Sequence, residues 1–315
     1  MAQLQDIPLI VIGGPTGVGK TALSLEIAHQ FNGEIINGDS MQVYRHLDIG
    51  TGKIRPDEQG NIPHHLLDVI GVEEKYDASR FKHEAKQIIQ TIWQKGKLPI
   101  VVGGTGLYLE GLLYDLEFGG DDSVSKEVRQ ALQAKANQIG NHMLWQELKA
   151  VDPVAAQSIS EQNVRRVIRA LEVIQTTGKL FSEQDTHHKQ QSVFNECVLI
   201  LDIPRPQLYD KINTRVSSMV EEGLEQEAKW LFERAESKSL PSMKGIGYKE
   251  WRPYFEGIAS HDSVVELIQQ NSRRYAKRQL TWFRNRMKET NWLDNSHPEV
   301  AIEEAITLIQ SHITQ

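Results

Sequence analysis

Short apolar, β-rich runs recur along this chain and alternate with stretches of helical periodicity. The runs cover residues 7–12, 34–36, 66–70, 98–102 and 198–203. Strands that alternate with helices are typical of a parallel sheet covered by helices on both faces. The pattern therefore predicts an α/β fold with strands at these positions.

Residues 119–196 break this pattern, because the β-rich runs stop and helical patterns replace them. The clearest helix starts after the N-cap residue Asn163 and ends at Gly178. Its expected apolar face comprises Val164, Val167, Ile168, Leu171 and Ile174, and its expected polar face comprises Arg165, Arg169 and Glu172. The polar segment 185–191 is expected to be the return linker. We predict a core formed by residues 1–118 and 197–315, which finishes in helices, with a helical insertion at 119–196.

Composition narrows the class of protein. The 315 residues contain one cysteine, Cys197, which excludes an intramolecular disulfide or a thiolate-rich zinc site and fits a reducing cytoplasm. No apolar stretch approaches the roughly 20 residues of a membrane span, and no basic leader precedes the first run. We expect a cytoplasmic protein without a membrane partner. The net charge of −7 argues against indiscriminate polyanion binding.

Residues 14–21 read Gly-Pro-Thr-Gly-Val-Gly-Lys-Thr, a complete G-x-x-x-x-G-K-[ST] phosphate loop between the first run and a helical segment. Its backbone N–H groups and the helix N-terminus favour linked phosphates. Lys20 would bridge the terminal phosphate oxygens, and the Thr21 hydroxyl would ligate Mg²⁺. The expected phosphate-binding residues are Gly14, Pro15, Thr16, Gly17, Val18, Gly19, Lys20 and Thr21.

Segments after the first, second and fourth runs should converge on one cleft, because ligands bind at the carboxyl ends of parallel strands. Asp39 could there ligate Mg²⁺, act as a general base or cap the next helix. Thr105, in a Gly-rich turn, offers a hydroxyl to a phosphate or a reacting group. Asp202 resembles the metal-binding Asp of phosphate-loop NTPases, but we favour a turn residue at a strand end.

Residues 273–288 contain seven cations and no acid. Ala276, Leu280, Phe283 and Met287 fall at helical spacing, which predicts one face on the core and an opposite basic face. That face is a candidate phosphate-backbone site, with a solvated helix face as the alternative. The histidine pairs at 64–65 and 187–188 are expected in loops or the core, because adjacent residues do not face one way.

Further motifs follow the phosphate loop: Asp-Ser-Met-Gln-Val-Tyr (39–44), Asp-Ile-Gly-Thr (48–51), Val-Gly-Gly-Thr-Gly-Leu-Tyr (102–108), Asp-Pro-Val-Ala-Ala (152–156), Arg-Arg-Val-Ile-Arg-Ala-Leu-Glu-Val (165–173), Lys-Gly-Ile-Gly-Tyr-Lys (244–249) and Ala-Lys-Arg-Gln-Leu-Thr-Trp-Phe-Arg (276–284). In this order they resemble the bacterial tRNA dimethylallyltransferases, also called tRNA isopentenyltransferases. The resemblance covers nearly the whole chain.

The resemblance implies a P-loop NTPase-like sheet whose loop holds the diphosphate of dimethylallyl diphosphate rather than ATP. The dimethylallyl group would pass to the exocyclic N6 of the tRNA adenosine that is 3′-adjacent to the anticodon. Asp39 would accept the N6 proton and Thr105 would line the channel. Arg215, the loop and Mg²⁺ would neutralise the departing diphosphate.

The resemblance also implies tRNA contacts, with the helical insertion clasping the anticodon stem-loop and no obligate protein partner. The implied residues are Asp39, Ser40, Met41, Gln42, Thr105, Arg129, Arg165, Arg166, Val167, Ile168, Arg169, Lys244, Gly245, Ile246, Gly247, Tyr248 and Lys249. The basic face of residues 273–288 adds Arg278 and Arg284.

Three rival functions remain open on the sequence. Adenylate isopentenyltransferases alkylate a free nucleotide, but they need neither a helical arm nor a basic C-terminal helix. An ATP-dependent small-molecule kinase would require Asp202 as a Mg²⁺ ligand and Asp39 as the base. A non-catalytic RNA-binding NTPase switch would leave the Asp39 segment without a role.

Overall fold

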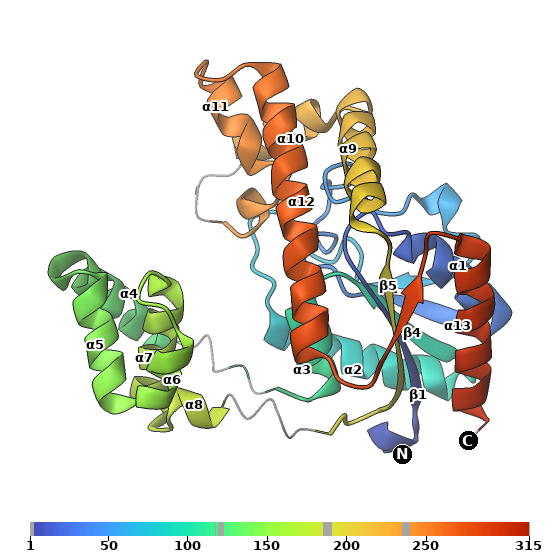
Figure 1. The fold of residues 1–315 in the computed structure, drawn as a ribbon, viewed down its shortest axis with the longest axis horizontal. Helices are drawn as coiled ribbons and strands as arrows, with labels where there is room; N and C mark the ends of the chain where they lie inside the picture. The colour runs from blue at the N-terminus through green and yellow to red at the C-terminus, as the bar shows by residue number, and fades with distance from the viewer. Residues whose placement is uncertain (1–2, 117, 119–122, 185–190, 235–239, 315) are drawn as a thin grey trace. The chain divides into compact units, whose positions relative to one another are not determined.

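The computed structural model describes residues 3–116, 118, 123–184, 191–234 and 240–314. The chain divides into two compact units, one formed by residues 1–116 with 192–315 and the other by residues 117–191. The first combines strands and helices, whereas the described part of the second is helical (Figure 1). We call them the core unit and the helical unit.

The core unit is built on a parallel sheet, which within the described residues has six strands in the order β3-β2-β4-β1-β5-β6. The strands are β1 (Pro8–Gly13), β2 (Gly33–Asn37), β3 (His64–His65), β4 (Leu98–Gly103), β5 (Asn195–Asp202) and β6 (Thr290–Asp294). Side chains of the central strands, such as Ile10, Ile100 and Leu199, are fully buried. The α/β fold with a parallel sheet is confirmed.

Helices cover both faces of this sheet. The step from β1 to β2 runs one way along the sheet and the step from β2 to β4 runs back, so right-handed crossovers put their helices on opposite faces. Helix α1 (Lys20–Gln30) packs with α13 (Pro298–Ile313), whereas α2 (Ala78–Gln94) packs with α3 (Gly106–Leu113), as Figure 1 shows. The long α12 (His261–Arg286) packs against α3 and α9 (Arg205–Glu221).

Two further helices belong to the described part of the core unit. Helix α10 spans Leu224–Arg234 and α11 spans Arg252–Phe255. Single 3₁₀ turns lie at Leu4–Asp6, Pro56–Glu58, Ser242–Lys244 and Lys249–Trp251.

The helical unit contains α4 (Ser123–Ile139), α5 (Asn141–Val151), α6 (Pro153–Ser158), α7 (Val164–Thr177) and α8 (Phe181–Gln184). The prediction of α7 is confirmed at both ends. The Asn163 side chain accepts a hydrogen bond from the Arg166 N–H, and Gly178 ends the helix at φ +69°.

One expected exposure in α7 is wrong, because Glu172 is fully buried rather than on a polar face. Arg129 donates two hydrogen bonds to its carboxylate, at 2.9 and 2.8 Å, and Arg169 also pairs with it. Burial of this charge is tolerated because two guanidinium groups pair with it. The pattern of one helix could not show a partner that comes from another.

One strand prediction is also wrong, and one strand was missed. Residues 66–70 do not form a strand, since Leu66 and Asp68 have φ of +60° and +56°. The strand lies just before them, at His64–His65. The sequence also gave no sign of β6, which pairs with β5 near the end of the chain. All but the last residue of the expected return linker 185–191, and the second histidine pair, fall on residues 185–190, outside the described residues.

Candidate active site

The phosphate loop joins β1 to α1, as its motif requires. Gly14 and Gly19 have φ of +144° and +101°. A Cβ atom at Gly14 would lie 2.7 Å from the Leu201 carbonyl oxygen, and one at Gly19 would lie 2.6 Å from Asn295 Nδ2. Asn295 donates a 2.7 Å hydrogen bond to the Val18 carbonyl, so the segment after β6 supports the loop.

Lys20, the first residue of α1, turns back over the loop. Its Nζ donates hydrogen bonds to the carbonyls of Gly14 (3.0 Å) and Pro15 (2.8 Å). Burial lowers the pKa of Lys20 to about 8; the negative charge of Asp39 opposes this shift and the positive charge of Arg215 adds to it. An anion beside Lys20 would favour the charged amine.

A cavity of about 570 Å³ opens beside this loop; we call it the phosphate cavity. Its lining includes Thr16, Lys20 and Thr21 from the loop, and Asp39 from the segment after β2. Helix α9 contributes Lys211 and Arg215, and the end of β4 with the residue that follows it contributes Gly103 and Gly104. The expected convergence of the segments after β1, β2 and β4 is thus found, and α9 joins them.

Arg215 is half-buried and lines this site. Burial lowers the pKa of its guanidinium, and the charge of Asp39 opposes that shift. Nη2 donates a 3.4 Å hydrogen bond to the Gly52 carbonyl. A Cβ atom on Gly52 would lie 1.6 Å from Nη2, and Gly52 has φ +57°, so a side chain there would strain the backbone and displace the Arg215 guanidinium.

Glu227 of α10 holds that segment in place, a role that the sequence did not reveal. Its carboxylate accepts hydrogen bonds from the N–H groups of Asp48, Ile49 and Gly50, at 2.8 to 2.9 Å. It also accepts one from the Tyr248 hydroxyl at 2.7 Å. Tyr248, expected among the tRNA-binding residues, is buried and supports Glu227 through this hydrogen bond.

Asp39 does not cap a helix, which removes one of its three possible roles. Its Oδ1 accepts a 2.8 Å hydrogen bond from the Met41 N–H, and no helix starts in this described segment. Asn37 fixes the Asp39 backbone through both its N–H and its carbonyl. The roles of base and metal ligand remain compatible with this geometry.

Thr105 is joined to the Asp39 segment. Its Oγ1 accepts a hydrogen bond from the Ser40 N–H (3.0 Å) and donates one to Ser40 Oγ (3.3 Å). The Tyr275 hydroxyl also bonds to Thr105, and burial together with the charge of Asp39 raises the pKa of Tyr275. The turn after β4 and the segment after β2 therefore form one hydrogen-bonded wall.

A second cavity of about 320 Å³ shares Thr16, Asp39, Thr51 and Arg215 with the phosphate cavity; we call it the acceptor cavity. Its other expected residues are Ser40, Met41, Lys244, Gly245, Ile246, Gly247, Lys249 and Arg278. Gln42 lines the phosphate cavity instead. Asp39 and Arg215 thus stand where the two cavities meet.

Gln279 of α12 connects the two loops of the phosphate cavity, and sequence reasoning assigned it no role. Its Oε1 accepts a hydrogen bond from the Thr16 N–H, and its Nε2 donates one to the Gly104 carbonyl, both at 2.9 Å. The side chain is 4% exposed. A buried amide bonded to two loops fixes their spacing. Its place in the Arg-Gln-Leu-Thr-Trp motif was the one available signal.

Other expected site residues lie elsewhere. Val18 is buried in the core unit, and Val167 and Ile168 are buried in the helical unit, so their side chains are not offered to RNA. Arg129 and Arg169 pair with Glu172, whereas the Arg165 side chain is exposed. Arg284 lies outside both cavities.

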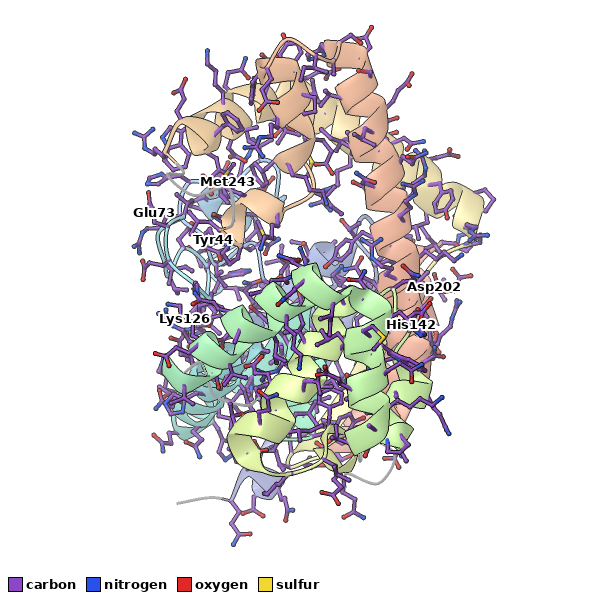
Figure 2. All side chains as sticks on the ribbon, turned by 90° about the vertical axis from the view of Figure 1, so that its left-hand side faces the viewer. Tyr44, Glu73, Lys126, His142, Asp202 and Met243 are labelled. Atoms are coloured by element: carbon purple, nitrogen blue, oxygen red, sulfur yellow. The ribbon has the colours of Figure 1, made fainter. Side chains whose placement is uncertain are left out.

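Arg284 pairs at 2.9 Å with Asp202, which lies beside α12 (Figure 2). Asp202 lines neither the phosphate cavity nor the acceptor cavity, in agreement with its expected place at a strand end. Acidic side chains reach the basic face of residues 273–288 from other elements, because Arg284 pairs with Asp202 and Arg286 pairs with Glu110.

Within the described residues, no cluster of three or more His, Cys, Asp or Glu side chains could hold a metal ion. Thr21, whose hydroxyl group is the expected Mg²⁺ ligand, lines the phosphate cavity. None of the described helices combines the length and the apolar character that a membrane crossing requires.

Residues 42–286 match the family model of the IPP transferases. The chain is 52% identical over 295 residues to the tRNA dimethylallyltransferase of Limosilactobacillus reuteri (strain DSM 20016), covering 92% of this chain and 94% of the relative. It is 51% identical over 295 residues to the tRNA dimethylallyltransferase of Lactiplantibacillus plantarum, covering 93% of each.

Solved structures give the same picture. The tRNA isopentenylpyrophosphate transferase of Bacillus halodurans matches with a TM-score of 0.72 and 39% identity over 98% of each chain. That of Staphylococcus epidermidis matches with a TM-score of 0.71 and 39% identity over 97% of this chain and 99% of that chain. A eukaryotic dimethylallyltransferase acting on tRNA matches with a TM-score of 0.83 and 31% identity, over 98% of this chain and 80% of the other.

Proposed function

This chain belongs to the IPP transferase family, and we propose that it transfers a dimethylallyl group from dimethylallyl diphosphate to tRNA. The acceptor would be the exocyclic N6 of the adenosine 3′-adjacent to the anticodon, and the products N6-isopentenyladenosine and diphosphate. One observation carries this proposal: Asp39 and Arg215 line both the phosphate cavity and the acceptor cavity. A leaving group and a base can therefore meet at these two side chains.

The donor would bind through its diphosphate in the phosphate cavity. Backbone N–H groups of residues 14–21, the N-terminus of α1, Lys20 and Arg215 are the groups available to an anion there. Thr21 and the diphosphate suit Mg²⁺, which commonly takes only one or two protein oxygens beside phosphates and water. Mg²⁺ would neutralise charge on the diphosphate, as Lys20 and Arg215 would.

The transfer itself needs a proton acceptor, because an adenine amine is a poor nucleophile. The bond between N6 and C1 of the dimethylallyl group forms, the bond between C1 and the diphosphate oxygen breaks, and an N6 proton passes to the Asp39 carboxylate. Thr105 would line the channel next to Ser40. The adenosine must leave its stack, which costs a few kcal/mol and is easiest in a single-stranded loop.

The tRNA would contact residues around the acceptor cavity, including Ser40, Met41, Lys244–Lys249 and Arg278. In the helical unit, Arg129 and Arg165–Arg169 would clasp the anticodon stem-loop, chiefly through Arg165 and Arg166 since Val167 and Ile168 are buried. A tRNA acceptor would place the reaction in the cytoplasm.

The kinase alternative lacks support. It needs Asp202 as a Mg²⁺ ligand, but this carboxylate accepts hydrogen bonds from the Ile203 N–H and from Arg284, outside the phosphate cavity.

Incubation with labelled dimethylallyl diphosphate or with ATP, each without an acceptor, with unmodified tRNA or with AMP, tests the proposal. We expect dimethylallyl diphosphate, but not ATP, to label the tRNA. The Lys20→Ala variant should give no label, because the Lys20 side chain lies in the phosphate loop. Label transfer to free AMP instead of tRNA would favour the adenylate isopentenyltransferases. Lys20-dependent binding of ATP without prenyl transfer would overturn the proposal.

A further inference from the structure

A third cavity, of about 700 Å³, lies at the carboxyl ends of β5 and β6, between α9 and α12. Its lining residues differ from all those of the phosphate and acceptor cavities. Figure 2 shows Asp202, at its border, beside α12. Because ligands of parallel α/β sheets bind beyond the carboxyl ends of strands, this cavity occupies a typical position for a ligand site.

Cations line this third cavity. Arg205 is the first residue of α9, whose N-terminus adds partial positive charge. The Lys277 ammonium has no hydrogen-bond or ion-pair partner within the described part of the chain, and its side chain is exposed. Arg284 is paired with Asp202. Arg205 and Lys277 are therefore the groups available to a phosphate.

Aromatic and acidic side chains complete the lining. Arg205 lies over the Tyr209 ring at 5.5 Å, and Arg284 lies over the Trp292 ring at 5.4 Å. Trp292 is 37% exposed although it lies in a strand. Asp294 is exposed, and its Oδ1 accepts hydrogen bonds from Ser296. An indole surface suits a base, and a carboxylate suits ribose hydroxyls.

We propose that the third cavity binds a nucleoside monophosphate. The phosphate contacts Arg205 and Lys277, the ribose hydroxyls donate to Asp294, and the base packs on Trp292. An isoprenoid diphosphate fits the third cavity less well, because two carboxylates lie among its three cations and would repel a second phosphate. The phosphate cavity, in contrast, contains a loop whose motif binds linked phosphates. The proposal does not depend on the transfer reaction.

Calorimetric titration with AMP tests this site in the full chain. AMP should bind wild type and Lys20→Ala equally, because Lys20 lies in the other cavity. Lys277→Glu should weaken binding at least about tenfold through loss of a charged hydrogen bond, and Trp292→Leu about 5- to 100-fold through loss of stacking. Lys229→Glu, an exposed lysine of α10, is the matched control and should bind as wild type does.

Adenosine and inorganic phosphate should each bind more weakly than AMP. Binding of dimethylallyl diphosphate should be weakened by Lys20→Ala and unchanged in Lys277→Glu. Loss of AMP binding in Lys20→Ala would place it in the phosphate cavity and overturn the proposal. So would equal binding of AMP and inorganic phosphate. If Lys277→Glu weakens tRNA binding but leaves AMP binding unchanged, the cavity is an RNA contact instead. Melting temperatures of all variants check that each is folded.

Discussion

Asp39 combines the properties that a transfer reaction needs from a single residue. It lines both cavities, and its Oδ1 already accepts a hydrogen bond from the Met41 N–H. The Asn37 side chain holds the Asp39 backbone through hydrogen bonds to its N–H and its carbonyl. A residue held in this way is oriented before substrates bind.

Asp39→Asn keeps the shape of the side chain but cannot accept a proton. We expect the single-turnover rate of transfer to fall by roughly 10²- to 10⁴-fold, with much smaller changes in dimethylallyl diphosphate and tRNA binding. Asp262→Asn, on the exposed first turn of α12, is the control and should keep the wild-type rate. A wild-type rate in Asp39→Asn would end the role of base, and rescue by excess Mg²⁺ would indicate a metal ligand instead.

Lys20 should make diphosphate binding depend on pH. Its pKa is lowered to about 8, so the free amine loses its charge as the pH rises through that value. Affinity for dimethylallyl diphosphate should fall between about pH 7 and about pH 9.5, and binding above about pH 8 should take up a proton. Titration calorimetry in buffers of different ionisation enthalpy measures both.

Lys20→Arg is the matched variant for this pH dependence, because a guanidinium keeps its charge over the same range. Its affinity should vary less with pH than that of the wild type. A wild-type affinity that stays constant through this range would contradict the assignment of Lys20 to the diphosphate.

Gln279 sets the spacing of two loops, so its replacement should affect rate more than binding. Gln279→Leu loses both hydrogen bonds, and we expect a rate loss of about 10²-fold at saturating substrates. Stability should fall by about 1–3 kcal/mol because two backbone groups lose their partner. Single-turnover kinetics and urea unfolding measure the two effects. Gln270→Leu, exposed on the same helix, is the control, and equal rates in both variants would refute the role.

At the scale of elements, α12 serves different sites with different faces. Gln279 supports the phosphate cavity, Tyr275 and Arg278 line the acceptor cavity, and Lys277 and Arg284 line the third cavity. The sequence showed one basic face, because helical periodicity sorts apolar from polar positions but does not show what each polar position meets.

Arg278 and Arg284 should therefore differ in their effect on tRNA binding. Arg278→Gln should weaken it and reduce the log–log salt slope by up to about one unit for a lost phosphate contact. Arg284→Gln should change the slope less, because Arg284 already pairs with Asp202. Filter binding of tRNA over a range of salt concentrations measures both. Equal slopes for the two variants and the wild type would remove this helix from the RNA interface.

Elements could be predicted wherever local signals agreed. Helix α7 was found at both ends because Asn163 is a strong helix start signal and Gly178 is a strong stop signal. The strand expected at residues 66–70 failed because Leu66 and Asp68 have positive φ, and contacts such as the Asn37 hydrogen bond to the Leu66 carbonyl stabilise this backbone. Strand β6 was missed because its residues become a strand only by pairing with β5.

At the scale of the whole molecule, one buried carboxylate near the edge of the sheet should make the stability of the fold depend on pH in acid. Glu34 of β2 is 2% exposed and bonds to His65 and Lys97, at 2.7 and 2.8 Å. Burial raises its pKa, but these hydrogen bonds and the nearby lysines outweigh it and lower the pKa to about 2.

A carboxylate with a lowered pKa stabilises the fold above its ordinary pKa, and this stabilisation is lost as the pH falls through about 4.5 towards about 2. Glu34→Gln should therefore lose about 1–3 kcal/mol at pH 7 and show a smaller further loss in acid. Urea unfolding at about pH 7 and about pH 3 measures this, with the exposed Glu304→Gln as the control. An equal acid dependence in wild type and Glu34→Gln would refute it.

The sequence by itself determined the α/β class, the phosphate loop and the family resemblance, because these depend on local periodicity and on residues adjacent in the chain. The tertiary structure decided what depends on distant residues. Gln279 reaches Thr16 across the fold, Glu227 clasps the segment at Asp48, and Arg129 neutralises Glu172. Hydrogen bonds and ion pairs act over a few ångströms in space, whereas a sequence pattern records only neighbours along the chain.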